Sequence, residues 1–261
     1  MISLVLLGAA GRMGRAVEQA AAGSADLQIK ARVDRAERLP PPGARAAGEA
    51  WSDSLESSLA KGDVVVDFSA GPATRAAARL AGARGAALVS GTTGLDPAAE
   101  AELRTASERV AVLRSANFSL GVAALRRALA ATIAALPPSW DVEIVERHHR
   151  GKVDSPSGTA LVLAKEAASI RGWKSDVLRF GREGRVGPRP ASEIGVHAVR
   201  GGTWIGDHAV LLSGDGEWVE LRHVACDRQS FAVGAVAAAR FVATAPAGLY
   251  TMDDVLNPAG R

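Results

Sequence analysis

The sequence has only one cysteine, Cys226, among its 261 residues. A single thiol excludes an intramolecular disulfide and a metal cluster built on thiolates, and it suits a reducing compartment. Aromatic residues are also scarce, at 4% of the chain, whereas apolar residues make up 48%. This composition indicates a globular protein and favours helices packed closely on a sheet over an aromatic-centred β-sandwich.

Long apolar runs are absent as well. No stretch approaches the roughly 18 uninterrupted apolar residues of a membrane helix, and residues 1–8 lack the basic flank and the length of a signal peptide. We therefore expect a cytoplasmic protein without a membrane partner. The 31 basic side chains are dispersed among 28 acidic ones without a Lys/Arg block, so we expect no nucleic-acid partner either.

Three glycines open the first helical pattern of the chain. A short apolar run ends at Gly8, and Gly11 and Gly14 follow at the start of an alanine-rich segment. The next apolar run, 27–34, ends in an acid, Asp34. Glycines at a strand-to-helix turn, followed by an acid that ends the next strand, are typical of a dinucleotide-binding site. The alternative is a glycine-rich turn needed only for close packing of the helix.

The same alternation continues through the first half of the chain. Short apolar runs alternate with amphipathic helical patterns, as a parallel sheet covered on both faces requires. The predicted strands lie at 63–69, 86–94 and 110–118, and the predicted helices at 72–83 and 96–108. We therefore predict an α/β fold with a Rossmann-like, doubly wound parallel sheet.

In such a sheet the ligand lies beyond the carboxyl ends of the strands. The residues that end the predicted strands are mostly small or hydroxylic, which lets a flat ring approach the backbone; they are 67–69, 91–93 and 116–118. Each of them taken alone also fits ordinary turn chemistry.

The pattern changes after residue 118. A strongly apolar helix is predicted at about 119–136, then a strand at 140–149 with one solvated face, and a helix at 157–171. Further strands are predicted at 177–181, 194–202, 204–214 and 217–225, with a last helix at 229–245. We therefore expect a second α+β domain built on a mixed sheet at 119–228, inserted into a dinucleotide-binding domain formed by 1–118 and 229–261.

The stretch IVERHHRGKVDSPSGTALVLAK concentrates positive charge between two apolar runs. His148 and Lys152 are four residues apart, so their side chains cooperate only if the chain bends between them, which Gly151 permits. A helix is predicted directly afterwards. The alternative is a solvated charged turn that leads into an ordinary helix start.

The start of that helix suits an anion. Pro156 fits an early helical position, and the backbone N–H groups of Ser157, Gly158 and Thr159 would then form a carboxylate cradle at the positive end of the helix. The other histidines, His197, His208 and His223, lie singly in strand patterns, and Cys226 is expected inside a strand. We predict no metal site from them.

The loop 182–190 carries Arg182, Arg185 and Arg189 among glycines and prolines. It is either a solvated connection or a mobile basic lid over an anionic substrate.

Several segments follow one another in a recognisable order: GAAGRMGRAV, VVVDFS, SGTTG, SANFSLGV, EIVERHHRGKVDSPSGTA and FGREG. Together they resemble the dihydrodipicolinate reductase family, whose members are also called 4-hydroxy-tetrahydrodipicolinate reductases. The resemblance runs through nearly the whole chain, and HHRGKVDSPSGTA is its most specific segment.

The resemblance implies an oxidoreductase of lysine and diaminopimelate biosynthesis. Such an enzyme uses NADPH or NADH to reduce a cyclic dicarboxylic imine, 4-hydroxy-tetrahydrodipicolinate, to tetrahydrodipicolinate with loss of water. It also implies a homotetramer that assembles through the sheet of the second domain. Arg147, Arg150 and Lys152 would offset the charge of the two substrate carboxylates.

The resemblance also implies residue roles. His148 would donate the proton that follows hydride addition, and Lys152 would assist it. Substrate would be bound by His149, Gly158 and Thr159. The coenzyme would be bound at its pyrophosphate by Gly8, Ala9, Ala10, Gly11, Arg12 and Met13, at its adenine ribose by Asp34 and Arg35, and at its nicotinamide by Gly91, Thr92, Thr93, Ser115, Ala116, Asn117 and Phe118.

Two other functions share parts of this pattern. Another two-domain NAD(P)-dependent dehydrogenase of amino-acid metabolism would share the nucleotide fold, although a semialdehyde dehydrogenase would need a nucleophilic cysteine near the cofactor. A non-catalytic nucleotide-sensing regulator would keep the glycine loop but has no use for the segment around His148. Residues 35–51 carry no pattern that fixes the preference between NADH and NADPH beyond Arg35 itself.

Overall fold

The computed structural model describes residues 1–257. It divides into two compact units, the first formed by Met1–Leu120 with Arg228–Arg261 and the second by Gly121–Asp227. The end of the expected segment 229–261, residues 258–261, lies outside the described residues. Among the described helices, none combines the length and the apolar character needed to cross a membrane.

The first unit contains a seven-stranded sheet in which every neighbouring pair of strands is parallel. Its strands are β1 (Ile2–Leu7), β2 (Leu27–Val33), β3 (Trp51–Ser52), β4 (Val64–Asp67), β5 (Ala87–Ser90), β6 (Ala111–Arg114) and β12 (Gly248–Tyr250). Their order across the sheet is β12-β6-β5-β4-β1-β2-β3, so the direction of winding reverses between β1 and β4. The Rossmann-like, doubly wound sheet is confirmed.

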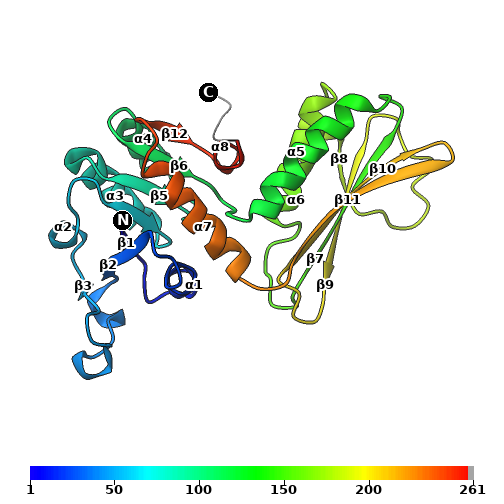
Figure 1. Cartoon of the computed structure of the whole chain (residues 1–261). Helices are drawn as coiled ribbons and strands as arrows, with labels where there is room; N and C mark the ends of the chain where they lie inside the picture. Colours follow the sequence, from blue (N-terminus) through cyan, green and yellow to red (C-terminus); the bar gives the residue numbers. More distant parts are fainter. Residues whose placement is uncertain (258–261) are drawn as a thin grey trace. The chain divides into compact units, whose positions relative to one another are not determined.

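Helices cover both faces of this sheet. They are α1 (Arg12–Ala21), α2 (Leu55–Ser58), α3 (Gly71–Arg84), α4 (Pro97–Ser107), α7 (Gln229–Val242) and α8 (Met252–Leu256). Right-handed crossovers on either side of the reversal place α1 and α3 on opposite faces. Alanines of α3 and Leu103 of α4 form one buried cluster with Val65 and Leu88, while α7 lies along α1 and contacts β4, β5 and β6 (Figure 1).

Four elements of this unit, α7, β12, α8 and β3, differ from the sequence-based expectation. The helix predicted at 229–245 ends at Val242, and the tail beyond it adds the edge strand β12 and the short helix α8. α8 begins with a capping box in which Thr251 and Asp254 satisfy each other's backbone N–H groups. The strand β3 was also not predicted, because two residues are too few to show an alternating pattern.

The second unit contains a five-stranded mixed sheet. Its strands are β7 (Asp141–His148), β8 (Leu178–Phe180), β9 (Ile194–Arg200), β10 (Gly206–Gly214) and β11 (Glu217–Ala225), in the order β11-β10-β7-β9-β8. β9 is parallel to both β7 and β8, whereas β10 is antiparallel to its two neighbours. The predicted mixed sheet is confirmed.

Two helices, α5 (Leu120–Ala135) and α6 (Gly158–Ile170), cover one face of the mixed sheet (Figure 1). The core beneath them joins Leu129 and Leu163 to apolar side chains of β7, β9 and β10. Burial alternates along β7, with the even-numbered residues 142–148 buried and the odd-numbered ones partly exposed. Glu146 and His148 therefore lie on the helix-covered face, in line with Val142 and Ile144.

Candidate active site

The glycine-rich turn after β1 has room for backbone only. Gly8 has a φ of +81°, and a Cβ atom there would lie 2.6 Å from the carbonyl oxygen of Phe68. A Cβ on Gly14 would lie 2.5 Å from the carbonyl oxygen of Gly8. Gly11 is the N-cap of α1, whose first turn contains Arg12 and Met13. The turn thus brings closely packed backbone, without side chains at its three glycines, to a helix N-terminus at the reversal of the sheet, which fits a pyrophosphate.

Asp34 shapes this turn from the end of β2. One carboxylate oxygen accepts the N–H of Ala10 at 2.9 Å, and the other accepts the N–H of Arg35 at 2.9 Å. The Asp34 side chain is 5% exposed, whereas that of Arg35 is 72% exposed and pairs with Glu37 at 3.3 Å. The acid predicted at the adenine ribose therefore also holds the glycine turn in place.

Asp67, at the end of β4, organises the neighbouring strand ends. It is fully buried and accepts hydrogen bonds from the hydroxyls of Thr74 at 2.6 Å, Ser90 at 3.0 Å and Thr92 at 3.1 Å. Ser69 donates both its N–H and its hydroxyl to the same carboxylate. Of the residues expected to line the site here, Thr92 is thus held by Asp67, while Thr93 is exposed.

The segment predicted at the nicotinamide is ordered by its own side chains. Ser115 donates its hydroxyl to the carbonyl of Asn117 at 2.7 Å. Phe118 is buried, and its ring meets Phe68 edge to face with centroids 5.3 Å apart. Gly91 is necessary here, because a Cβ at that position would overlap the Phe68 ring. Ala116 is exposed.

In the second unit, His148 is the last residue of β7 and is 8% exposed. Its Nδ1 lies 2.5 Å from a carboxylate oxygen of Glu146, which is fully buried. Arg200 of β9 reaches both oxygens of the same carboxylate, at 2.7 and 2.8 Å. Burial of Glu146 opposes ionisation, but hydrogen bonds from Arg200, His148 and the N–H of Ser157 outweigh it and lower the pKa of the carboxyl.

His208 also lies in this cluster, so the interpretation of it as a solitary strand residue was wrong. Its ring centroid is 5.1 Å from that of His148, and its Nε2 is 2.9 Å from the hydroxyl of Ser157. Burial, and then the charge of His148, lowers the pKa of His208 to about 4. His208 is therefore a neutral imidazole at physiological pH. His223 faces it on β11, and Cys226 is exposed just beyond the end of that strand, not inside it.

The chain bends directly after His148, as cooperation between His148 and Lys152 requires. β7 ends there, Arg150 and Gly151 form a turn, and the N–H of Lys152 donates to the carbonyl of His149 at 3.1 Å. The ammonium group of Lys152 lies 2.8 Å from Asp154. In this structure, the cation predicted to assist His148 is thus paired with a carboxylate of its own loop.

The start of α6 differs in detail from the prediction. Pro156 precedes the helix, and Ser157 is the N-cap, with its hydroxyl accepting the N–H of Ala160 at 3.2 Å. The N–H of Ser157 donates to Glu146 at 2.9 Å, so it is not available to a substrate carboxylate. Gly158 and Thr159 are the first two helical residues, and the proposed cradle narrows to them.

Arg147 was wrongly grouped with the cations around His148. It points to the opposite face of β7, where it donates to Asp207 at 2.9 Å beside Arg222. Arg200, which sequence reasoning missed, takes its place at His148. Strand pairing explains this, because Arg200 is the direct partner of His148 in the parallel pair β7 and β9.

The basic loop 182–190 is tied to the sheet. Arg182 donates to Glu143 at 2.6 Å, and Arg189 donates to Asp141 at 2.6 Å. Burial opposes ionisation of Glu143, but hydrogen bonds from Arg182, His197 and Arg189 lower its pKa to about 2. Two of the three arginines are therefore held by ion pairs, which favours the solvated connection over the mobile lid.

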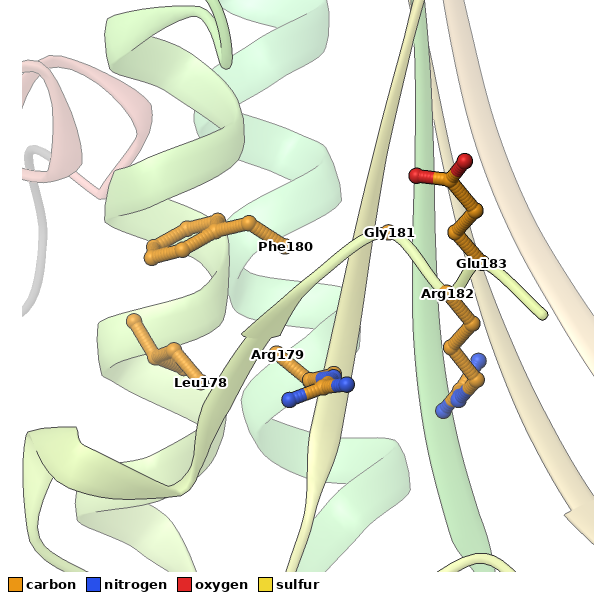
Figure 2. A pocket seen from close by; sticks show the side chains of 6 residues that line it. All are labelled: Leu178, Arg179, Phe180, Gly181, Arg182 and Glu183. Atoms are coloured by element: carbon orange, nitrogen blue, oxygen red, sulfur yellow. The ribbon is translucent and has the colours of Figure 1, made fainter. Parts of the chain in front are cut away.

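A hollow of about 620 Å³ lies where this loop leaves β8, lined by residues 178–183. Figure 2 shows Leu178 and Phe180 on the same side of the strand, with the side chains of Arg182 and Glu183 extending in opposite directions. β8 pairs with residues 194–196 of β9, while His148 pairs with Arg200 at the other end. At about 3.3 Å per residue, the hollow and His148 are separated by more than 10 Å of strand.

Comparison with known proteins finds a matching family model for each half of the chain. The family model described as dihydrodipicolinate reductase, N-terminus, matches residues 2–118, and the one described as dihydrodipicolinate reductase, C-terminus, matches residues 121–256. The chain belongs to the dihydrodipicolinate reductase family. Its relatives include the 4-hydroxy-tetrahydrodipicolinate reductases of Anaeromyxobacter sp. (strain Fw109-5), 42% identical, and Caulobacter vibrioides, 43% identical. The alignments cover 98% of this chain in both cases, and 98% and 97% of the relatives.

Solved structures agree with the fold of the family. A dipicolinate-bound dihydrodipicolinate reductase from Paenisporosarcina sp. TG-14 superposes with a TM-score of 0.79 at 24% identity, covering 96% of this chain and 97% of that one. A diaminopimelate dehydrogenase from C. glutamicum superposes with a TM-score of 0.56 at 14% identity, covering 99% and 96%.

Four residues of this family member were not anticipated in their roles: Glu146, Arg200, His208 and Asp67. Glu146 could have been found, because the alternation along the predicted strand places it on the same face as His148. Asp67 was recognised only as a lining residue. Arg200 and His208 gave no local signal, since they reach the site through pairing with β7.

Proposed function

We propose that this chain reduces 4-hydroxy-tetrahydrodipicolinate to tetrahydrodipicolinate with NADH or NADPH, releasing water, in lysine and diaminopimelate biosynthesis. One observation carries the proposal: the family's most specific segment builds a buried His148 held by a carboxylate, two residues before a turn that presents Lys152. In this arrangement His148 can donate a proton, and the nearby Lys152 can bind an anion. A regulator that only senses nucleotides has no need of it.

The first unit supplies the dinucleotide site in this proposal. Its glycine turn, whose three glycines have no side chains, and the N-terminus of α1 fit a pyrophosphate, and the buried Asp34 fits a ribose hydroxyl. The coenzyme-binding residues that we propose are Gly8, Ala9, Ala10, Gly11, Arg12, Met13, Asp34, Arg35, Gly91, Thr92, Thr93, Ser115, Ala116, Asn117 and Phe118. When bound, the coenzyme supplies a hydride to the electron-poor ring of the substrate.

The second unit supplies the proton and holds the substrate. Loss of water from the substrate gives a carbon–carbon double bond conjugated with the imine, hydride addition to that double bond leaves an enamine, and His148 donates the proton that completes the reduction. Lys152 offsets negative charge at the substrate. His149, Gly158 and Thr159 bind substrate, with the N–H groups at the start of α6 directed at one carboxylate.

We also propose that the second unit carries the contacts of a homotetramer. The sheet face opposite α5 and α6 displays Trp218, which is 69% exposed, together with Val199 and Val224. Exposed apolar side chains gathered on one sheet face are typical of a subunit interface. Sedimentation of the whole chain should give four times the monomer mass, and Trp218→Glu should lower it. The proposed setting is the cytoplasm, where reduced nicotinamide coenzymes are available.

Coenzyme oxidation with freshly generated imine tests the activity. The wild-type chain should oxidise NADH and NADPH only when the imine is present. His148→Gln should lose about 10²–10⁴ in turnover while still binding coenzyme, since general acid catalysis is worth that much. His149→Gln is the matched control. If His149→Gln costs more turnover than His148→Gln, the roles of the two histidines are reversed. If the wild-type chain binds coenzyme but does not oxidise it in the presence of the imine, the result favours a regulator.

A further inference from the structure

Glu146 is the most heavily engaged buried carboxylate of the second unit. It is fully buried, yet it receives hydrogen bonds from three residues: Arg200, His148 and Ser157. Arg200 binds the Glu146 carboxylate in a bidentate arrangement, which is the strongest way for a side chain to hold a carboxylate in its charged form. The pKa of Glu146 is accordingly lowered in spite of its burial, by Arg200 first and then by His148 and Ser157.

An ionised carboxylate only accepts hydrogen bonds, and this fixes the chemistry of His148. The short contact of 2.5 Å between Nδ1 and Glu146 requires a hydrogen on Nδ1. In the neutral ring the lone pair is then on Nε2, and in the charged ring Nε2 carries the second hydrogen. Nε2 is therefore the nitrogen that gains and loses the proton.

The surroundings of Nε2 are consistent with proton transfer at this nitrogen. A Cβ atom added to Gly206 would lie 3.2 Å from Nε2, so a glycine at this position leaves space beside the nitrogen. His208, the imidazole next to His148, is neutral at physiological pH because its pKa is lowered to about 4, mainly by burial. It therefore places no second positive charge beside a protonated His148.

The same carboxylate connects His148 to the loop that follows it. One oxygen accepts from His148 and the other accepts the N–H of Ser157 at the start of α6. Arg200 in turn donates to the carbonyl of Asp154 at 2.7 Å. The two ends of the loop 149–157 are thus fastened to one buried ion pair.

We propose that Glu146 is a positioning residue for the reaction: it holds His148 in the tautomer with hydrogen on Nδ1, so that Nε2 delivers the proton, and it aligns His148 with the start of α6. This inference rests on the proposed function for its catalytic part. Its structural part, the tautomer of His148, can be measured in the protein without substrate or coenzyme.

The first test is a nitrogen NMR spectrum of the full chain labelled with ¹⁵N-histidine. The chain has five histidines, and the signals of His148 are those missing from His148→Gln. Above the pH at which the ring loses its proton, His148 should show a protonated Nδ1 and an unprotonated Nε2. A neutral ring with its hydrogen on Nε2 would overturn the proposal, and this result needs no variant at Glu146 to fold.

The second test is Glu146→Gln, which keeps the shape and removes the charge. Turnover should fall about a hundredfold, because a histidine in the wrong tautomer or orientation loses most of its value as an acid. The Michaelis constant for the coenzyme should change by less than about twofold, since only the transition state loses an interaction. His148 should no longer populate a single tautomer.

Glu166→Gln is the matched control, because Glu166 of α6 also binds an arginine, Arg126, through both oxygens in the same unit. It should keep both turnover and the His148 tautomer. Equal losses in the two variants, or unchanged turnover and tautomer in Glu146→Gln, would overturn the proposal. A wild-type chain without reductase activity would instead overturn the proposed function and leave the tautomer result standing.

Discussion

The ammonium nitrogen of Lys152 lies 2.8 Å from a carboxylate oxygen of Asp154, two residues along the same loop. The hydrogen bond from Lys152 is the main cause that lowers the pKa of Asp154. The Asp154 side chain is 53% exposed, so the pair contributes little to stability. The pair matters for function, because Lys152, which we propose binds a dicarboxylic substrate, is already paired with the carboxylate of Asp154.

Asp154→Asn should therefore strengthen substrate binding. Without a competing charge, Lys152 is available to the substrate, and the dissociation constant for pyridine-2,6-dicarboxylate should fall about two- to fivefold, a typical value for an exposed ion pair. Calorimetric titration measures this. Asp215→Asn removes the same charge from an exposed turn between β10 and β11 and should change nothing. Weaker binding in Asp154→Asn would mean that Asp154 holds Lys152 in a productive position.

Thr159→Val tests the narrowed cradle at the start of α6. If the Thr159 hydroxyl and the neighbouring N–H groups hold a substrate carboxylate, the loss of one charge-assisted hydrogen bond should weaken the binding of pyridine-2,6-dicarboxylate about tenfold. Thr132→Val removes a hydroxyl from α5 in the same unit, where it bonds only to the helix backbone at Ala128, and serves as the control. Equal affinities in Thr159→Val and the wild-type chain would show that the cradle lies elsewhere.

The sequence was sufficient wherever a local pattern decides the structure. The alternation of apolar runs and helices predicted the doubly wound sheet, and the period of two along β7 contains the information that Glu146 and His148 share a face. Arg200 and Arg147 show the limit. Arg147 is next to His148 in the sequence but on the other face, whereas Arg200 arrives through pairing with a strand more than fifty residues away.

Local sequence patterns also did not determine where some helices and strands begin and end. Pro156 is compatible both with the first turn of a helix and with the position before its N-cap. The structure places Pro156 before the N-cap because Ser157 is the N-cap, and the N–H of Ser157 donates to Glu146 on β7. β12 could not be predicted because its three residues pair with an existing sheet edge at β6, a contact that no pattern within the segment reveals.

Coenzyme choice depends on Asp34 and Arg35 together. Each oxygen of Asp34 accepts one backbone N–H and still has a lone pair for a ribose hydroxyl. The exposed Arg35 favours a 2′-phosphate. We expect both coenzymes to work, and a preference above about a thousandfold, roughly 4 kcal/mol, would contradict this.

Arg35→Gln should raise the Michaelis constant for NADPH about tenfold, since a charge-assisted contact to phosphate is lost. NADH, which lacks the 2′-phosphate, is the internal control and should be used as before. Equal changes for the two coenzymes would show that Arg35 acts on the fold of the turn and not on the phosphate.

His208 should make the protein sensitive to mild acid. Its folded pKa of about 4 lies below the ordinary value of 6.5, mainly because the ring is buried. Between these two values the unfolded chain binds a proton at this position that the folded chain does not. The associated stability is fully present above pH 6.5 and is lost as the pH falls toward 4, by up to about 3 kcal/mol.

The free energy of unfolding, measured in urea at intervals from pH 7 to pH 4, reveals this dependence. His208→Gln cannot titrate and keeps a polar group near Ser157, so its stability should fall less steeply with acid than that of the wild-type chain. His223→Gln is the matched comparison, because His223 faces His208 across β10 and β11 and burial also lowers its pKa. If His208→Gln and the wild-type chain lose stability in parallel through this window, the proton uptake lies at another group, and the neutral imidazole beside His148 is not what makes the fold sensitive to acid.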